Sequence, residues 1–506
     1  MRRIALGCIS LLLLTATARA EWLEASSDHF VIYGDQDEKA IRGFAGRLER
    51  FHAGMSLVLK KPQVKPSPSN RVAIYVVDSR SEVRAIAGSD DRYLAGVYLP
   101  RAGASIAVVP KLRAAKSAHD MSGEAILYHE YAHHFLASLT ARAFPRWFSE
   151  GFAEYFAGVR FKEDGSVTFG APATHRAMEL AYARDVPIRK LLEFDGGASD
   201  RKPGYDSFYG QSWALFHYLQ SDPARAGQLQ KYQHLLGTGD SALEAAEGAF
   251  GDLDQLEKDV DAYVGRRKML GLMVAGNALN VSPIAVRPLR PGEAAMMPIV
   301  AKSKSGVSRE EALALLPEAR EVAARYPDDP AVLAALAEAE FDVGLDDEAI
   351  AAADKAVAID PAQINAYIQK GYALTRKVKD AKLPHAAWKD VRSQWVKANK
   401  IENDHPIPLV RYYLSFVDKG ENPSEAAIDG LEWAMQLAPF DSSVRWMVAN
   451  QMIFDNRYAE AAMVLEPLAY SPHPGEHTDA ARRLLEEIEA KAGGALATST
   501  KPASAD

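Results

Sequence analysis

The 506-residue sequence predicts an α+β domain followed by an all-α domain. Three observations lead to this fold class. The chain is too long for a single hydrophobic core. Short β-branched runs alternate with helical periodicity in its first half. From about residue 310 the chain becomes Ala-rich, and only helical patterns remain. Hydrophobic residues at 48% and charged residues at 25% describe a soluble globular protein.

The first twenty residues have the pattern of a secretory leader. Arg2 and Arg3 form its positive end, residues 4–14 are apolar, and Ala-Arg-Ala at 18–20 fits a cleavage site. An uncleaved anchor is the alternative, but the apolar run is short for a bilayer span of about 20 residues. We expect residues 1–20 to be a signal peptide. The mature protein would then be periplasmic or secreted from a bacterium, without an integral membrane segment.

Charge and cysteine content exclude several kinds of site. The net charge is −8, and it becomes more negative without the three arginines of the leader. An acidic body offers no general attraction to phosphate, so nucleic acid is not expected as a partner. Cys8, the only cysteine, lies in the leader, so the mature chain has neither disulfides nor cysteine metal ligands. Any metal ion must be held by His, Asp and Glu.

Residues 21–267 are predicted to form the α+β domain. Strands are expected at HFVIYG (29–34), RVAIYVVD (71–78) and SIAVVP (105–110), and helices at 38–59, 118–140, 145–160, 207–220 and 222–236. The stretch at 95–110 contains Gly at a turn and predicts a hairpin just before the second of these helices. Residues 268–309 contain Pro, Gly and Ser with weak periodicity, and they predict a linker or a small connecting element.

Residues 310–490 carry a repeat. Pro327 and Pro361 are 34 residues apart, and Gly344, Ala349 and Ala356 lie between them. The period and the small residues match a tetratricopeptide repeat, in which paired helices approach closely. A non-repetitive helical bundle is the alternative.

A second match to this repeat includes Pro439, and an insertion within 377–390 accounts for its longer spacing. We expect four or five helix pairs over about 310–475, forming a solenoid that recruits protein partners. Residues 491–506 are predicted to form a disordered tail.

The stretch YHEYAHHF (128–135) predicts a metal site, because residues 129–133 fit the pattern HExxH. His129 and His133 are one helical turn apart and share a face, so both imidazoles can bind one ion. Glu130 is rotated by about 100° and is better placed to reach a water molecule on the metal. His134 points elsewhere, and we interpret it as a satisfied or surface histidine.

The third ligand is expected from PRWFSEGFAEYF (145–156). Glu150 and Glu154 are four residues apart among aromatic neighbours, so a wholly solvated face is disfavoured. We interpret Glu150 as the third ligand and Glu154 as a hydrogen-bond partner of a ligand histidine. Two imidazoles and one carboxylate favour Zn²⁺. Glu130 would take a proton from a zinc-bound water, and the hydroxide would attack a peptide carbonyl.

HEYAH followed by WFSEGFAEYF resembles the gluzincin zinc metallopeptidases, most closely the bacterial peptidase MA-like family. The resemblance implies a zincin-like fold over about 21–265, with Glu150 as a zinc ligand. YGQSWALFHYL (209–219) is similar to a segment whose tyrosine stabilises the oxyanion, which carries over to Tyr209. A packed aromatic at a helix start is the equally open alternative for Tyr209. The fold also implies that a strand within 95–110 can pair with an extended peptide substrate.

Two functions are therefore in competition. One is an exported zinc peptidase whose repeats recruit protein partners. The other is a tetratricopeptide scaffold with a structural or vestigial zinc site. Glu130, which a structural site would not need, favours the enzyme. The chain also resembles periplasmic metallopeptidases with C-terminal repeats. In those enzymes, however, the third zinc ligand usually lies on a helix with the pattern ExxxD. No GAMEN-like run is present, which favours endopeptidase action.

Overall fold

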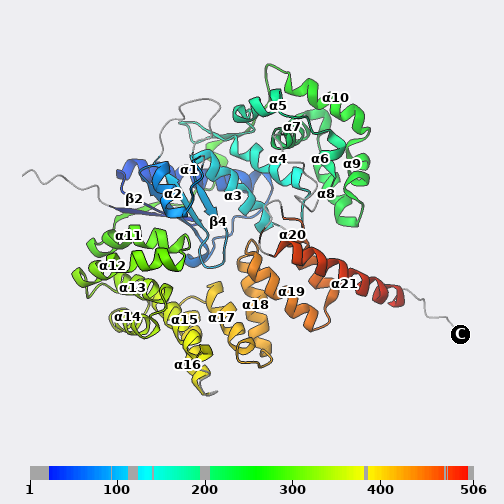
Figure 1. Cartoon of the computed structure of the whole chain (residues 1–506). Helices are drawn as coiled ribbons and strands as arrows, with labels where there is room; N and C mark the ends of the chain where they lie inside the picture. The colour runs from blue at the N-terminus through cyan, green and yellow to red at the C-terminus, as the bar shows by residue number, and fades with distance from the viewer. Residues whose placement is uncertain are drawn as a thin grey trace, which may run out of the picture.

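The computed structural model describes residues 22–92, 94–111, 123–139, 142–193, 206–380, 386–471, 475 and 477–499. The predicted signal peptide lies outside these residues. The described chain forms an N-terminal α+β domain and a C-terminal stack of helices that curves along it (Figure 1). Within the described part, every helix is too short or too polar to span a bilayer.

A six-stranded sheet lies at the centre of the N-terminal domain, in the order β4-β5-β3-β2-β1-β9. Its strands are β1 (Leu23–Ser26), β2 (Phe30–Gly34), β3 (Val72–Val77), β4 (Val97–Leu99), β5 (Ile106–Pro110) and β9 (Ala285–Pro288). Strands β2, β3 and β5 are parallel, whereas β1, β4 and β9 run antiparallel to their neighbours. The three predicted strands and the predicted hairpin are confirmed. In the hairpin, β4 becomes an edge strand of the sheet.

Helices cover both faces of this sheet. On β3, Ile74 and Val76 join the core beneath α1 (Glu38–Val58) and α3 (Gly123–Leu139). Tyr75 and Val77 point to the other face, toward α2 (Arg80–Ala87) and α11 (Pro291–Lys304). Successive strand residues point to opposite faces, so a strand buried on both sides reads as the continuous apolar run seen in the sequence.

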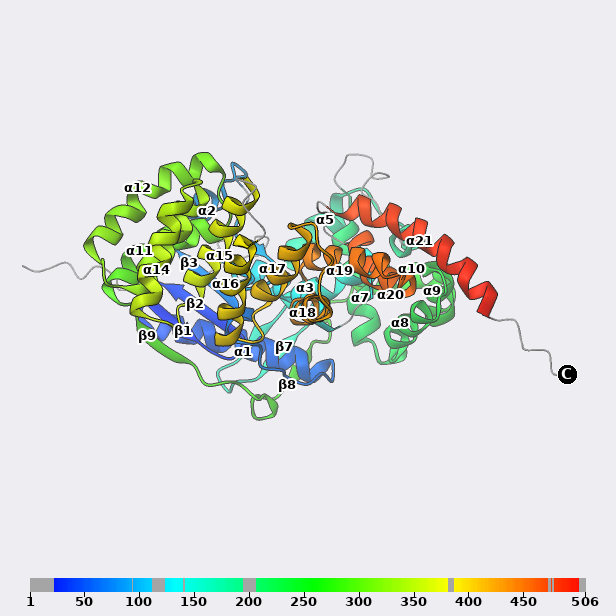
Figure 2. The same ribbon diagram turned by 90° about the horizontal axis from the view of Figure 1, so that it is seen from below.

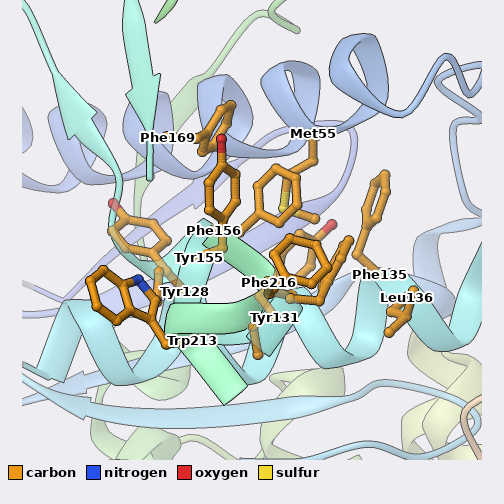
Figure 3. Packing of buried hydrophobic residues seen from close by; sticks show 14 of the residues in the cluster. Met55, Tyr128, Tyr131, Phe135, Leu136, Tyr155, Phe156, Phe169, Trp213 and Phe216 are labelled. Carbon is orange, nitrogen blue, oxygen red and sulfur yellow. The ribbon is translucent and has the colours of Figure 1, made fainter. Parts of the chain in front are cut away.

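Aromatic side chains of α3, α4 (Arg146–Ala157) and α7 (Phe208–Ser221) fill the core beside the sheet (Figure 3). Phe216 packs against Tyr155 with ring centroids 5.6 Å apart, and Phe156 meets Phe169 edge-on at 5.0 Å. Gly151 lets α4 lie directly on α7, because a Cβ there would come within 2.7 Å of the Phe216 Cβ. This close crossing sets the position of the residue before it, Glu150.

Short elements complete the N-terminal domain. A small sheet contains β6 (Arg160–Phe161), β7 (Val167–Phe169) and β8 (Leu272–Val274). The helices are α5 (Ala177–Tyr182), α6 (Ile188–Leu192), α8 (Gln228–Thr238), α9 (Ala242–Phe250) and α10 (Leu253–Val264). The helix predicted at 222–236 begins only at Gln228, because Pro223–Arg225 forms a 3₁₀ turn and Gly227 adopts a φ of 83°.

The linker predicted over 268–309 is wrong. Strand β8 pairs with β7, β9 pairs with β1, and α11 opens the helical stack. Three features explain why the sequence did not predict β8, β9 and α11. The two strands are short, most of their side chains are exposed, and Pro298 interrupts the pattern of α11. The chain therefore returns to the first domain before the repeats begin.

The helical-repeat solenoid is confirmed. Consecutive helices joined by short turns contact one another from α11 to α21. After α11 they are α12 (Arg309–Arg325), α13 (Pro330–Asp342), α14 (Asp346–Ile359), α15 (Ile364–Asp380), α16 (Ala387–Ile401), α17 (Pro406–Val417), α18 (Glu425–Leu437), α19 (Ser442–Phe454), α20 (Tyr458–Ala469) and α21 (Thr478–Ser499). Ala349 and Ala356 are fully buried between helices, and Gly344 turns the chain with a φ of 91°.

The insertion and the tail predicted for the repeat region both adjoin residues outside the described part. The insertion expected within 377–390 falls at the connection of α15 and α16, of which residues 381–385 lie outside the described part. The disordered tail predicted from residue 491 is partly wrong, because α21 continues to Ser499. Alanines at 490, 492, 495 and 497 favour helix there, and they outweigh the opposing effect of Gly493 and Gly494. Residues 500–506 lie outside the described part.

The repeats pack against the N-terminal domain. Ser69 Oγ donates to Glu402 Oε1 at 2.6 Å, and the Ala102 N–H donates to Asp441 Oδ2 at 2.7 Å. Ala102 lies at the tip of the β4–β5 hairpin and belongs to the hydrophobic cluster of α17–α21. The hairpin that forms the sheet edge is therefore held by the repeats.

We expect Gly371→Ala in α15 to lower the free energy of unfolding by about 1–3 kcal/mol. A Cβ at this position would lie 2.6–2.7 Å from atoms of the buried Trp395 ring of α16. Thermal denaturation of the full chain measures the effect. Gly430→Ala in α18 is the matched control, because its Cβ would meet only ordinary contacts at 3.6 Å or more. An unchanged melting temperature for Gly371→Ala would contradict this α15–α16 packing.

Candidate metal centre

Helices α3 and α4 bring the three predicted ligands together. The Nε2 atoms of His129 and His133, one turn apart on α3, are separated by 3.2 Å. The Oε2 atom of Glu150 on α4 lies 3.5 Å from His129 Nε2 and 3.4 Å from His133 Nε2. All three donor atoms therefore form a nearly equilateral triangle.

The size of this triangle fits a zinc ion. Tetrahedral zinc with ligands at about 2.0–2.1 Å has edges of about 3.3–3.4 Å between its donor atoms. The three measured sides, 3.2, 3.4 and 3.5 Å, match these edges. Two imidazole nitrogens and a carboxylate oxygen are also the donor types found in catalytic zinc sites, which leave the fourth position open.

The electrostatics of the site favour a bound cation. Glu150 and Glu154 are both 0% exposed. Burial opposes ionisation of Glu150, yet His133 and His129 hold its pKa well below the usual range. Burial likewise opposes a proton on His129, but the carboxylates of Glu150 and Glu154 raise its pKa to about 9. The negative charge that attracts a proton here would also attract a divalent metal ion.

Glu154 lies behind the ligands and is hydrogen-bonded to an adjacent histidine and arginine. Its Oε1 is 3.6 Å from His129 Nδ1, which is longer than the hydrogen bond predicted for it. Its hydrogen bonds go instead to His175 Nε2, at 2.8 Å, and to the Arg176 guanidinium, at 2.5 and 2.9 Å. Burial raises the pKa of Glu154, but these partners outweigh it and lower the pKa to about 2. A permanently charged carboxylate therefore faces the back of His129.

Glu130 lies where the site opens into a cavity. It lines a cavity of about 320 Å³ together with His133, Ser149 of α4 and Tyr98 of the edge strand β4. Ser149 Oγ is 3.4 Å from His133 Nδ1, so it contacts the ring nitrogen that faces away from the other ligands. Glu130 is thus beside the predicted ligands and open to a molecule in the cavity.

Two further residues with sequence-based predictions are His134 and Tyr209. The His134 ring is packed between aromatic rings: it stacks on Tyr131 at 5.5 Å and lies tilted against Phe440 at 4.0 Å. Tyr209 lies at the start of α7, where its hydroxyl contacts Arg146 at 3.2 Å and Arg176 covers its ring. Tyr209 is not among the described residues that line the cavity, and its oxyanion role stays a prediction.

Sequence reasoning missed His175, Arg176, Ser149 and Tyr98. His175 and Arg176 come from the 3₁₀ turn Thr174–Arg176, which carries no motif. Ser149 directly precedes Glu150, so its position on α4 is the only local signal that could have identified it. Tyr98 belongs to the hairpin that the sequence predicts, but its proximity to Glu130 depends on how the sheet packs against α3.

No protein-family model matches this chain, and no curated protein is significantly similar to it. Among solved structures, TTC0263, a thermophilic TPR protein of Thermus thermophilus, has 19% identity and a TM-score of 0.32, covering 39% of this chain and 99% of that one. MamA has 16% identity and a TM-score of 0.27, covering 40% and 99%. Yeast Tom70 has 14% identity and a TM-score of 0.26, covering 60% and 69%. At these low TM-scores, the helical-repeat assignment rests on the helix pairs described above.

We expect the purified protein to contain one zinc ion per chain and His133→Ala to lose it. The loss of affinity should exceed the roughly 10–100-fold typical of residues that only orient a ligand, because a donor atom is removed. Elemental analysis after dialysis measures the metal content. His134→Ala, the neighbouring change on the same helix, should retain zinc. Full zinc retention by His133→Ala would contradict the ligand assignment.

Proposed function

We propose that this protein is a zinc-dependent peptidase. The observation that carries the proposal is the triangle of His129, His133 and Glu150 donor atoms, with Glu130 beside it in an open cavity. A structural zinc site would be closed by a fourth protein ligand, whereas this set provides three ligands among the described residues. Zinc held there would polarise a carbonyl group and lower the pKa of water to about 7.

The residues of this chain then have distinct tasks. Glu130 would accept a proton from the attacking water and pass it to the leaving amine. Glu154, kept ionised by Arg176 and 3.6 Å from His129 Nδ1, would act on the imidazole of His129 through its charge rather than through a hydrogen bond. The edge strand β4 lies beside the cavity, and it would align an extended peptide by main-chain pairing.

A scaffold with a structural or vestigial zinc site is the second candidate. The observation that favours it is the helical stack α11–α21, which occupies nearly half of the chain and belongs to a class of folds that present extended binding surfaces. In either case we propose that the repeats bind protein partners. The two candidates differ in what Glu130 does, since a scaffold has no need of a general base.

We also propose that the protein is exported and processed after residue 20. The support is the leader pattern of residues 1–20 in the sequence. A mature N-terminus at Glu21 in protein isolated from the cell envelope would test this, and an intact Met1 in that fraction would contradict it.

Glu130→Gln is expected to lower kcat/KM for peptide hydrolysis by about 10²–10⁴-fold while zinc content stays unchanged. The amide keeps the shape of the side chain but cannot accept the proton. Cleavage of a peptide library, followed by mass spectrometry, measures activity. The control is Glu163→Gln, which removes an exposed carboxylate on the turn between β6 and β7. Equal hydrolysis by wild-type protein and Glu130→Gln would rule out the assigned mechanism, and hydrolysis by neither would favour the scaffold.

A further inference from the structure

The cavity beside the metal centre has a second wall that comes from the repeats. Its N-terminal side consists of Tyr98, Glu130 and His133, with their neighbours on α3 and α4. Its far side consists of residues around the start of α19 and the end of α20: Pro439, Phe440, Ser442, Arg445, Pro467, Leu468, Tyr470 and Ser471. Figure 2 shows repeat helices in front of the N-terminal domain, and Phe440, just before α19, packs against His134 of α3 at 4.0 Å. A molecule that reaches Glu130 through this cavity therefore also touches the repeats.

Arg445 is an unusual residue in that wall. Its side chain lines the cavity although the residue is only 4% exposed. Its guanidinium donates through Nε to the carbonyl oxygen of Pro439. Among the described residues, no carboxylate lies within ion-pair distance of Arg445, whereas the more exposed Arg176 pairs with Glu154. Burial without an anionic partner lowers the pKa of Arg445 to about 10.

The position of Arg445 is set by several contacts. It lies in the first turn of α19, where Asp441 caps the helix by accepting from the Val444 N–H at 2.9 Å. The second oxygen of Asp441 accepts from the Ala102 N–H of the β4–β5 hairpin at 2.7 Å. Asp441 thus joins the sheet edge to the helix that carries Arg445. An arginine held in this way keeps little freedom to turn toward solvent.

A buried, unpaired guanidinium is costly unless an anion completes its hydrogen bonds. The planar fork of arginine matches a carboxylate in a two-point contact. The charged side chains that line the cavity are Glu130, Arg142 and Arg445. The net charge of the lining is therefore positive, which favours an anionic ligand. The volume of about 320 Å³ suits a short end or a single side chain of a peptide rather than a folded protein.

We propose that Arg445 binds a carboxylate of the peptide substrate and so makes the repeats part of the substrate site. This inference rests on the proposed peptidase function. The carboxylate has two possible sources. It is either the free C-terminus of the substrate, which implies removal of C-terminal residues, or an acidic side chain near the cleaved bond, which implies endopeptidase action. Arg445 acts by positioning the substrate and takes no part in the proton transfer.

The experiment compares peptides of one sequence in three forms. The first has a free C-terminus and one glutamate, the second has a C-terminal amide, and the third has glutamine in place of the glutamate. Hydrolysis by the full-length wild-type protein is measured for each, together with binding to the zinc-loaded Glu130→Gln variant by fluorescence anisotropy. Removing the recognised carboxylate should weaken binding and raise KM by about 10–100-fold. Loss on amidation identifies the C-terminus, and loss with glutamine identifies the side chain.

Variants of Arg445 test the other side of the contact. Arg445→Met should remove the preference for the carboxylate form, and Arg445→Lys should keep only part of it, because lysine lacks the planar fork. Arg483→Met, an exposed arginine on α21, is the matched control and should keep the full preference. Melting temperature and zinc content show whether each variant is folded, and the comparison of peptides needs no variant at all.

The outcomes separate the two proposals. Hydrolysis and binding that are equal for all three peptides would overturn the carboxylate subsite and leave the peptidase function intact. Carboxylate-dependent binding that Arg445→Met abolishes, without hydrolysis of any peptide, would support the subsite and overturn the peptidase function. A preference retained in a folded Arg445→Met protein would overturn the role of Arg445.

Discussion

The structure depends on two carboxylates, Glu150 and Glu154, buried in an aromatic core. Helix α4 can place them there because Gly151 lets it lie directly on α7. Such charges are tolerated in a core only when cations face them. Glu154 is hydrogen-bonded to Arg176 and His175, and Glu150 faces the two imidazoles of α3. The polar cluster at the crossing of α3 and α4 follows from this one requirement. A metal ion is the cation that would complete it.

The repeats take part in the same cluster from the far side. The tip of the β4–β5 hairpin donates a hydrogen bond to Asp441, which joins the sheet edge to the start of α19. His134, one residue after a predicted ligand, packs against Phe440. The helical stack therefore forms one side of the cavity beside Glu130. Residues of both domains therefore line the space beside the candidate metal centre.

Local patterns predicted most of the elements well. The continuous apolar runs became β2, β3 and β5, and the alanines spaced along 349–356 became the contact face of a helix pair. The errors arose where local signals were weak or misleading. The edge strands β8 and β9 are short and largely exposed, so 268–309 looked like a linker. The oxyanion role of Tyr209 stays a prediction, because its contacts with Arg146 and Arg176 fit either interpretation.

The sequence by itself determined which side chains share a face. The helical period places His129 with His133 and Glu150 with Glu154, whatever the rest of the fold does. Only the tertiary structure decided that these two faces meet, that Arg176 neutralises Glu154, and that Arg445 closes the cavity from some three hundred residues away. Periodicity encodes the direction of a side chain within one element. The partner it meets is chosen by the packing of elements that are distant in the chain.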